Sequence, residues 1–151
     1  MARTLGGFFL AVIITYIAGA VFISQGNLAQ VAALGLEVTM GIRIDAAVHD
    51  VSNMYGIYLP VVAVALLIAL PVARLVIRFL PSARLIGYTL AGFVALLATH
   101  LIMAAVFNGI VGIAPARFID GLLLQGIAGA LGGLAFHYVT RLAGSNPPAV
   151  A

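Results

Sequence analysis

A cluster of ionisable side chains lies between two long apolar stretches of the chain. Arg43, Asp45, His49 and Asp50 fall within eight positions of one another. Asp45 and His49 are four positions apart, so on a helix they share one face. A carboxylate and an imidazole at this spacing could supply two ligands to a metal ion. The carboxylate could instead orient the imidazole as a general base.

A metal site needs a third and a fourth ligand, and Glu37, Asp50 or Asp120 could contribute. The zinc-protease pattern HExxH is missing, and the sequence contains no cysteine. The simpler interpretation is a solvated helix face on which Asp45 and His49 form an ordinary side-chain pair. We therefore predict no cofactor, and keep Asp45 and His49 as the candidate ligands of the metal alternative.

His100 is a strongly ionisable residue inside a long apolar stretch, and Gln125 falls at a similar depth in the next stretch. Polar groups inside a membrane need partners, and those without a structural role often mark a transport path. We expect a hydrogen bond between the His100 imidazole and the Gln125 amide that joins two helices. The alternative is a polar path for a proton or ligand.

The composition indicates which kind of protein could position these residues. The 151 residues are 64% hydrophobic and only 7% charged, whereas soluble domains carry roughly a quarter charged residues. Such a surface must face lipid, because water could not solvate it. The seven basic residues are scattered arginines, which argues against nucleic acid as a partner. The missing cysteine excludes disulfides, thiol redox chemistry and iron–sulfur clusters.

Four apolar stretches are long enough to cross a hydrocarbon core of ~30 Å. They cover residues 5–23, 57–79, 84–107 and 118–139. The sequence therefore predicts an all-α integral membrane protein: a four-helix bundle in one domain, residues 1–151. The first stretch could instead be a signal peptide cut after Ala20. Its apolar run continues through Ile23, which favours a membrane anchor.

Between the first two stretches, residues 24–56 are predicted to form a structured outer loop. Gln25, Gly26 and Asn27 suggest a turn at the exit from the membrane. Apolar residues recur at helical spacing from Ile44, which would place Asp45 in the first turn of a short helix.

The arginines predict the orientation in the membrane. With both termini in the cytoplasm, five arginines lie inside: Arg3, Arg74, Arg78, Arg84 and Arg141. Two lie outside, Arg43 and Arg117, in agreement with the positive-inside rule. Loops 24–56 and 108–117 are then periplasmic, and all four acids, Glu37, Asp45, Asp50 and Asp120, lie on the outer side. Asp120 is expected to cap the fourth helix and to pair with Arg117 or, alternatively, with Arg43.

These features favour a small non-enzymatic protein of a bacterial inner membrane. We expect a subunit, scaffold or accessory factor that works through helix packing and its acidic outer loop. Besides the lipid bilayer, its partner would be another protein or a second copy of the chain. Small residues at close-packing spacing, Gly126, Gly129, Ala130 and Gly133, would mediate that contact. The alternatives are an oligomeric transporter or channel lined by His100 and Gln125, and an outer-face metal protein or enzyme.

Overall fold

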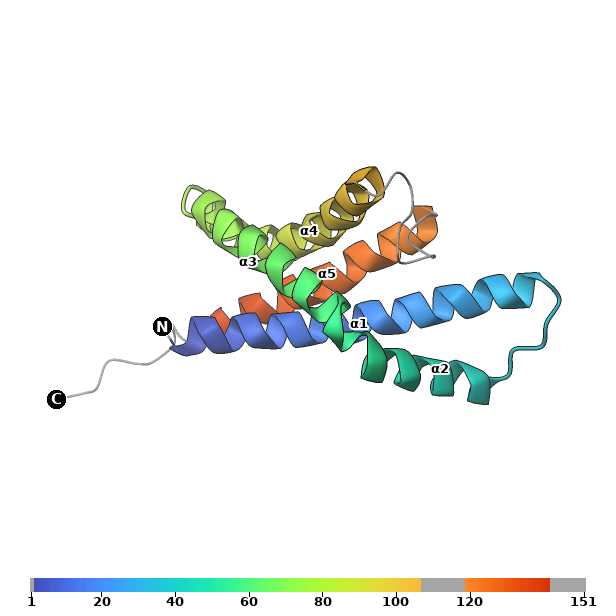
Figure 1. Ribbon diagram of the computed structural model, residues 1–151. Coiled ribbons are helices and arrows are strands. Elements are labelled where there is room, and N and C mark those ends of the chain that lie inside the picture. The colour runs from blue at the N-terminus through green and yellow to red at the C-terminus, as the bar shows by residue number, and fades with distance from the viewer. Residues whose placement is uncertain (1, 107–118, 142–151) are drawn as a thin grey trace.

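In the computed structural model, residues 2–106 and 119–141 are described, and these ranges form helices without a strand. Four of the helices are long and apolar enough to cross a membrane: α1 (Ala2–Ala33), α3 (Tyr58–Ile77), α4 (Arg84–Val106) and α5 (Ile119–Arg141) (Figure 1). The expected all-helical chain with four apolar helices is thus confirmed. The last three helices begin and end within two residues of the predicted bounds.

The first helix is longer than predicted. α1 has 32 residues and is about 48 Å long at 1.5 Å per residue. The predicted turn at Gln25, Gly26 and Asn27 is wrong, because all three residues are helical. The helix ends at Ala33 in a turn formed by Leu34 and Gly35. Gly35 has a φ of 83°, which is accessible to glycine, and its N–H donates to the Ala32 carbonyl at 3.0 Å.

The short helix α2 (Met40–Asn53) begins four residues before the predicted position. Thr39 is its N-cap, and the Thr39 hydroxyl accepts a hydrogen bond from the Ile42 N–H at 3.3 Å. Asp45 therefore lies in the second turn, so the prediction that it meets the helix dipole in the first turn is wrong. A 3₁₀ turn, Met54–Gly56, leads from α2 into α3.

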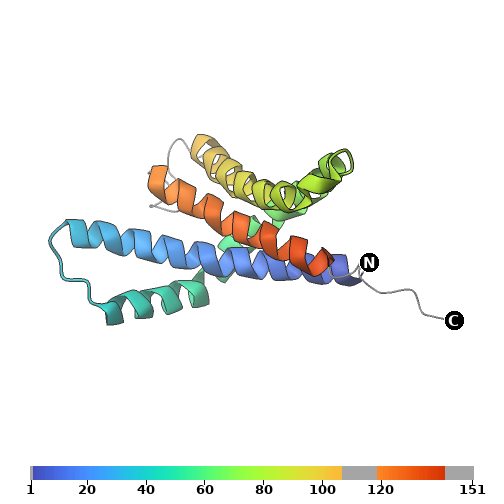
Figure 2. The same ribbon diagram turned by 180° about the vertical axis from the view of Figure 1, so that it is seen from behind.

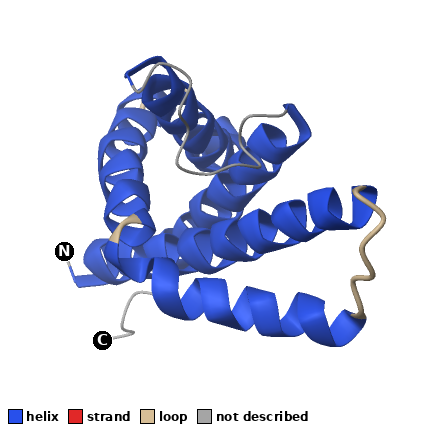
Figure 3. Cartoon of the chain, turned by 45° about the vertical axis from the view of Figure 1, so that its right-hand side comes forward, coloured by secondary structure: helices blue, strands red, loops and turns tan. Residues whose placement is uncertain are grey.

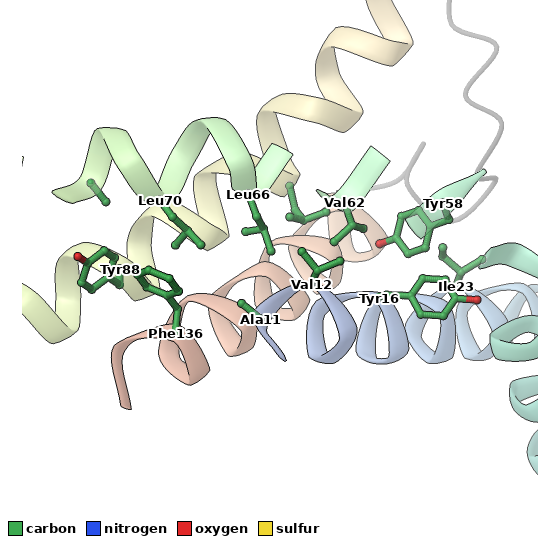
Figure 4. Close-up of a cluster of buried hydrophobic side chains, with 12 residues drawn as sticks. Ala11, Val12, Tyr16, Ile23, Tyr58, Val62, Leu66, Leu70, Tyr88 and Phe136 are labelled. Carbon is green, nitrogen blue, oxygen red and sulfur yellow. The ribbon is translucent and has the colours of Figure 1, made fainter. Parts of the chain in front are cut away.

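Helix α5 packs between α1 and α4, while α3 packs against α4 and α1 (Figure 2). The hydrophobic core runs along these contacts. In Figure 4 Tyr16 lies near Tyr58, and Tyr88 meets Phe136. The Tyr88 and Phe136 rings meet edge to face at a centroid distance of 5.0 Å. Helix α2 packs mainly on α1.

Glycines allow α5 to approach both neighbours closely. A Cβ at Gly129 or Gly133 would collide with a backbone carbonyl of α4, and one at Gly132 with Thr15 of α1. Gly126 packs against Phe93 of α4. Gly126, Gly129 and Gly133, which we expected to bind a partner, are therefore buried within the chain itself, and Ala130 is half-buried.

Candidate functional site

Polar groups from four helices meet at one depth inside the protein. Gln125 is at the centre of this polar layer, which consists of Gly19, Tyr58, His100 and Gln125. Each residue stands sixteen positions along its helix from an arginine, which corresponds to about 24 Å. The matching arginines are Arg3, Arg74, Arg84 and Arg141.

The Gln125 amide joins three helices. Its Oε1 accepts a hydrogen bond from the Tyr58 hydroxyl of α3 at 2.5 Å, and its Nε2 donates to the Gly19 carbonyl of α1 at 3.2 Å. The Gly19 carbonyl is reachable because glycine has no side chain. A Cβ there would collide with the Tyr58 hydroxyl. The polar layer thus fixes where α1, α3 and α5 stand relative to one another.

His100 occupies the same layer but does not bind Gln125. Its Nδ1 lies 2.7 Å from the Leu96 carbonyl of its own helix, and its ring packs edge to face against Tyr58. Its Nε2 is buried without a hydrogen-bond partner among the described residues. The predicted His100–Gln125 hydrogen bond is therefore wrong, because the Gln125 amide is hydrogen-bonded to Tyr58 and Gly19 instead.

Gly19 and Tyr58 are the two members of this layer that the sequence did not predict at the depth of His100 and Gln125. Tyr58 begins an apolar stretch, a position typical of an interfacial aromatic residue. The sixteen-residue spacing from Arg74 is a signal that could have placed it at the depth of His100 and Gln125. In this conformation the polar layer is closed, because His100 and Gln125 are each only 1% exposed.

The second candidate site is the hairpin formed by α1 and α2. Gln25 and Arg43 bind each other reciprocally: the Gln25 amide donates to the Arg43 carbonyl at 3.0 Å, and the Arg43 guanidinium donates to the Gln25 side chain at 3.1 Å. Nearer the core, the Tyr16 hydroxyl donates to the Val51 carbonyl. Figure 3 shows the two helices side by side, joined at their far end by the loop after α1.

The hairpin extends past the polar layer. Ala33 lies thirty positions beyond Arg3, or about 45 Å along α1, whereas a hydrocarbon core is ~30 Å thick. Glu37 lies in this projecting part, and Asp45 lies near its base, two residues after Arg43. Asp50 lies nearer the core, next to Val51, whose carbonyl binds the Tyr16 hydroxyl. Asp120 lies in the first turn of α5, as expected. The acids are therefore at the end opposite Arg74, Arg78 and Arg84.

The acidic side chains do not converge. The His49 Nδ1 lies 3.4 Å from the carboxylate of Asp50, its neighbour in sequence, and no other acidic and basic side chains lie within 4 Å of each other in residues 2–106 and 119–141. No three histidine, aspartate or glutamate side chains come together as a metal site within the described part of the chain. Asp45 and His49 are both exposed on α2.

Asp120 lies beside α1 rather than beside Arg43. It lines a groove of about 450 Å³ between α1 and α5, together with Gln25 and Gln30. Arg43 is held by Gln25, and no Asp120–Arg43 ion pair occurs between these described residues. The expected pairing of Asp120 with Arg117 concerns a residue outside the described ranges, as does loop 108–117.

Comparisons with protein-family models, curated proteins and solved structures found no match. The two candidate sites must therefore be interpreted from their own chemistry. The polar layer has the chemistry of a helix-joining network. The hairpin presents acidic and apolar groups that the other described helices leave exposed.

Proposed function

We propose that this protein is a non-enzymatic subunit or accessory factor of a bacterial inner membrane, and that it binds a partner protein through the α1–α2 hairpin. Both termini would lie in the cytoplasm and the hairpin in the periplasm. The observation that carries this proposal is the exposed apolar stripe of α2, formed by Met40, Ile44 and Val48.

The packing of α2 leaves this stripe free. The side toward α1 is formed by half-buried residues that include Ala47, Asp50 and Val51, and no residue of α2 is fully buried. Ile44 is 57% exposed and Val48 is 62% exposed. Asp45 and His49 are exposed beside the stripe, so the uncovered surface combines apolar and acidic groups.

The position of the stripe relative to the membrane indicates whether lipid or a protein would contact it. Arg43 pairs with Gln25, which is twenty-two positions from Arg3, or about 33 Å along α1. If the hydrocarbon core begins near Arg3, then Met40 and Ile44 lie at or beyond its outer edge. Val48 lies closer to Val51, which binds Tyr16, so it is within the core depth. Exposed apolar residues outside the lipid commonly mark a protein interface.

Photo-cross-linking tests this proposal. A photoreactive residue at Ile44 should give one discrete protein adduct in native membranes, and Asp45→Arg should greatly reduce it. The control position is Val94, an exposed residue within α4, where we expect adducts with lipid only. Equal protein adducts at both positions, or none at Ile44, would contradict the docking role.

The orientation is tested separately. Five arginines lie at the end where α1 begins and α5 ends, and the acids at the other. A reporter that is active only in the periplasm should be inactive when fused after Arg141, and active when inserted between Leu36 and Thr39. The opposite pattern would reverse the proposed topology.

The transporter alternative rests on the buried, unpartnered His100 Nε2. It requires that water reach the polar layer in some state of the protein. Because the chain has no cysteine, His100→Cys can be probed with a water-soluble maleimide, with Ser52→Cys on exposed α2 as the positive control. Labelling at position 100 would favour transport, whereas labelling at position 52 alone would favour a closed structural layer.

A further inference from the structure

The arginine end of the protein contains a basic pocket formed by all four long helices or their ends. Arg74 and Arg78 line it from the end of α3, and Arg84 lines it from the start of α4. Thr4 of α1, Tyr88 of α4 and Thr140 of α5 add hydroxyl groups to its lining, and its volume is about 400 Å³. Three positive charges thus face one cavity.

No acidic side chain of the described residues lies at this end to balance them. All four acids lie in or beside the hairpin or at the start of α5, at the opposite end. Arg74 and Arg78 are four positions apart on one helix, where like charges repel. An anion in the pocket would relieve this repulsion.

Arg84 is already positioned for such an anion. Its guanidinium donates to the Thr140 hydroxyl at 3.0 Å and lies 5.9 Å from the centre of the Tyr88 ring. These contacts fix the plane of the guanidinium while leaving further N–H donors. Arginine donors held in this way suit phosphate oxygens.

An apolar groove of about 350 Å³ begins at the same place. It lies between α1 and α3, and it shares Thr4, Arg74 and Phe136 with the basic pocket. From Arg74 it extends to Leu67, seven positions or about 10 Å along α3. Its other walls include Phe8 and Phe9, so an apolar chain could lie along it.

We propose that the basic pocket and the apolar groove together bind one anionic phospholipid of the surrounding leaflet. The phosphate would contact Arg74, Arg78 and Arg84, and one acyl chain would lie against Phe9 and Leu67. The continuity of the two cavities favours a lipid over a free phosphate ion, because a free ion would use the pocket alone. Basic pockets between membrane helices bind anionic lipid head groups by this chemistry.

The test is native mass spectrometry of the full chain released from detergent, with phosphatidylglycerol or phosphatidylcholine of the same acyl chains added. We expect one phosphatidylglycerol to be retained, at an occupancy at least tenfold above that of phosphatidylcholine. Glycerol phosphate, which has no acyl chains, should not be retained. Equal retention of the two lipids, or retention of glycerol phosphate at the level of phosphatidylglycerol, would overturn the proposal.

Variants locate the site. The double variant Arg74→Gln, Arg78→Gln changes exposed side chains that are dispensable for packing, and it should lower phosphatidylglycerol occupancy about tenfold. Arg141→Gln removes an arginine at the same end that does not line the pocket, and it should leave occupancy unchanged. Leu67→Trp should lower occupancy by filling the groove without changing the charge. An equal loss with Arg141→Gln would mean that net charge, not this pocket, retains the lipid.

Discussion

Helices α5 and α2 show two ways in which this chain holds a helix. α5 is packed on two sides, and its glycines bring its backbone against α1 and α4. α2 has no fully buried residue and is held to α1 by the Gln25–Arg43 pair and by the Tyr16–Val51 hydrogen bond. Close packing against α1 and α4 thus accounts for the glycines of α5. The exposed side of α2 is not covered by the other described helices.

The largest effect is expected from breaking the close packing of α5. In Gly129→Ala the new methyl group would collide with the Gly92 carbonyl, and neither backbone can move alone. The helices must separate, which we expect to cost about 3 kcal/mol of the free energy of unfolding. Thermal unfolding in detergent measures this loss.

Gly6→Ala is the matched control for that substitution. Gly6 lies within α1, and a Cβ there would meet no atom within 4 Å. Alanine also favours helix over glycine by up to about 1 kcal/mol, so this variant should be neutral or more stable. If both variants lost stability equally, the glycine contacts would not be what positions α5.

A smaller effect is expected from the polar layer. Gln125→Leu leaves the Tyr58 hydroxyl and the Gly19 carbonyl without their partner, which should cost about 1–2 kcal/mol. His100→Leu should cost less, no more than about 0.5 kcal/mol, because it removes a hydrogen bond within its own helix, from Nδ1 to the Leu96 carbonyl, and leaves no group of another helix without its partner. An equal loss in the two variants would show that His100 takes part in the network.

The sequence predicted the apolar helices well and the polar contacts poorly. Long apolar stretches depend only on local composition, so α3, α4 and α5 were placed within two residues. The predicted contact between His100 and Gln125 rested only on their similar depth in the membrane. Depth does not determine which side of a helix a residue faces, and Tyr58 and Gly19 face the amide instead.

The hairpin illustrates the same limit for local signals. Gln25, Gly26 and Asn27 favour a turn, but packing against α2 keeps them helical through the reciprocal bonds between Gln25 and Arg43. Gly35, with its positive φ, provides the actual end of the helix. Local propensities could not have distinguished a turn at Gln25 from a helix that continues past it, because the helix is held there by a contact with a residue eighteen positions away.

Breaking that contact should loosen α2 without unfolding the rest. Gln25→Ala removes both hydrogen bonds to Arg43, and we expect a loss of about 1 kcal/mol confined to the hairpin. Amide hydrogen exchange should therefore speed up in α2, while α5 stays protected. Gln30→Ala, further along the same helix, is the control and should leave exchange in α2 unchanged.

The smallest effect on stability should come from Asp45 and His49. Asp45→Asn and His49→Gln alter side chains exposed on α2, so each should change stability by a few tenths of a kcal/mol at most. A chelator should not shift the melting temperature of the wild-type protein, because the described acids and histidines do not converge. If Asp45→Asn nevertheless lowers the yield of the Ile44 adduct, the carboxylate serves a partner and not the fold. Unchanged adduct yield would leave the apolar stripe as the whole of the docking surface.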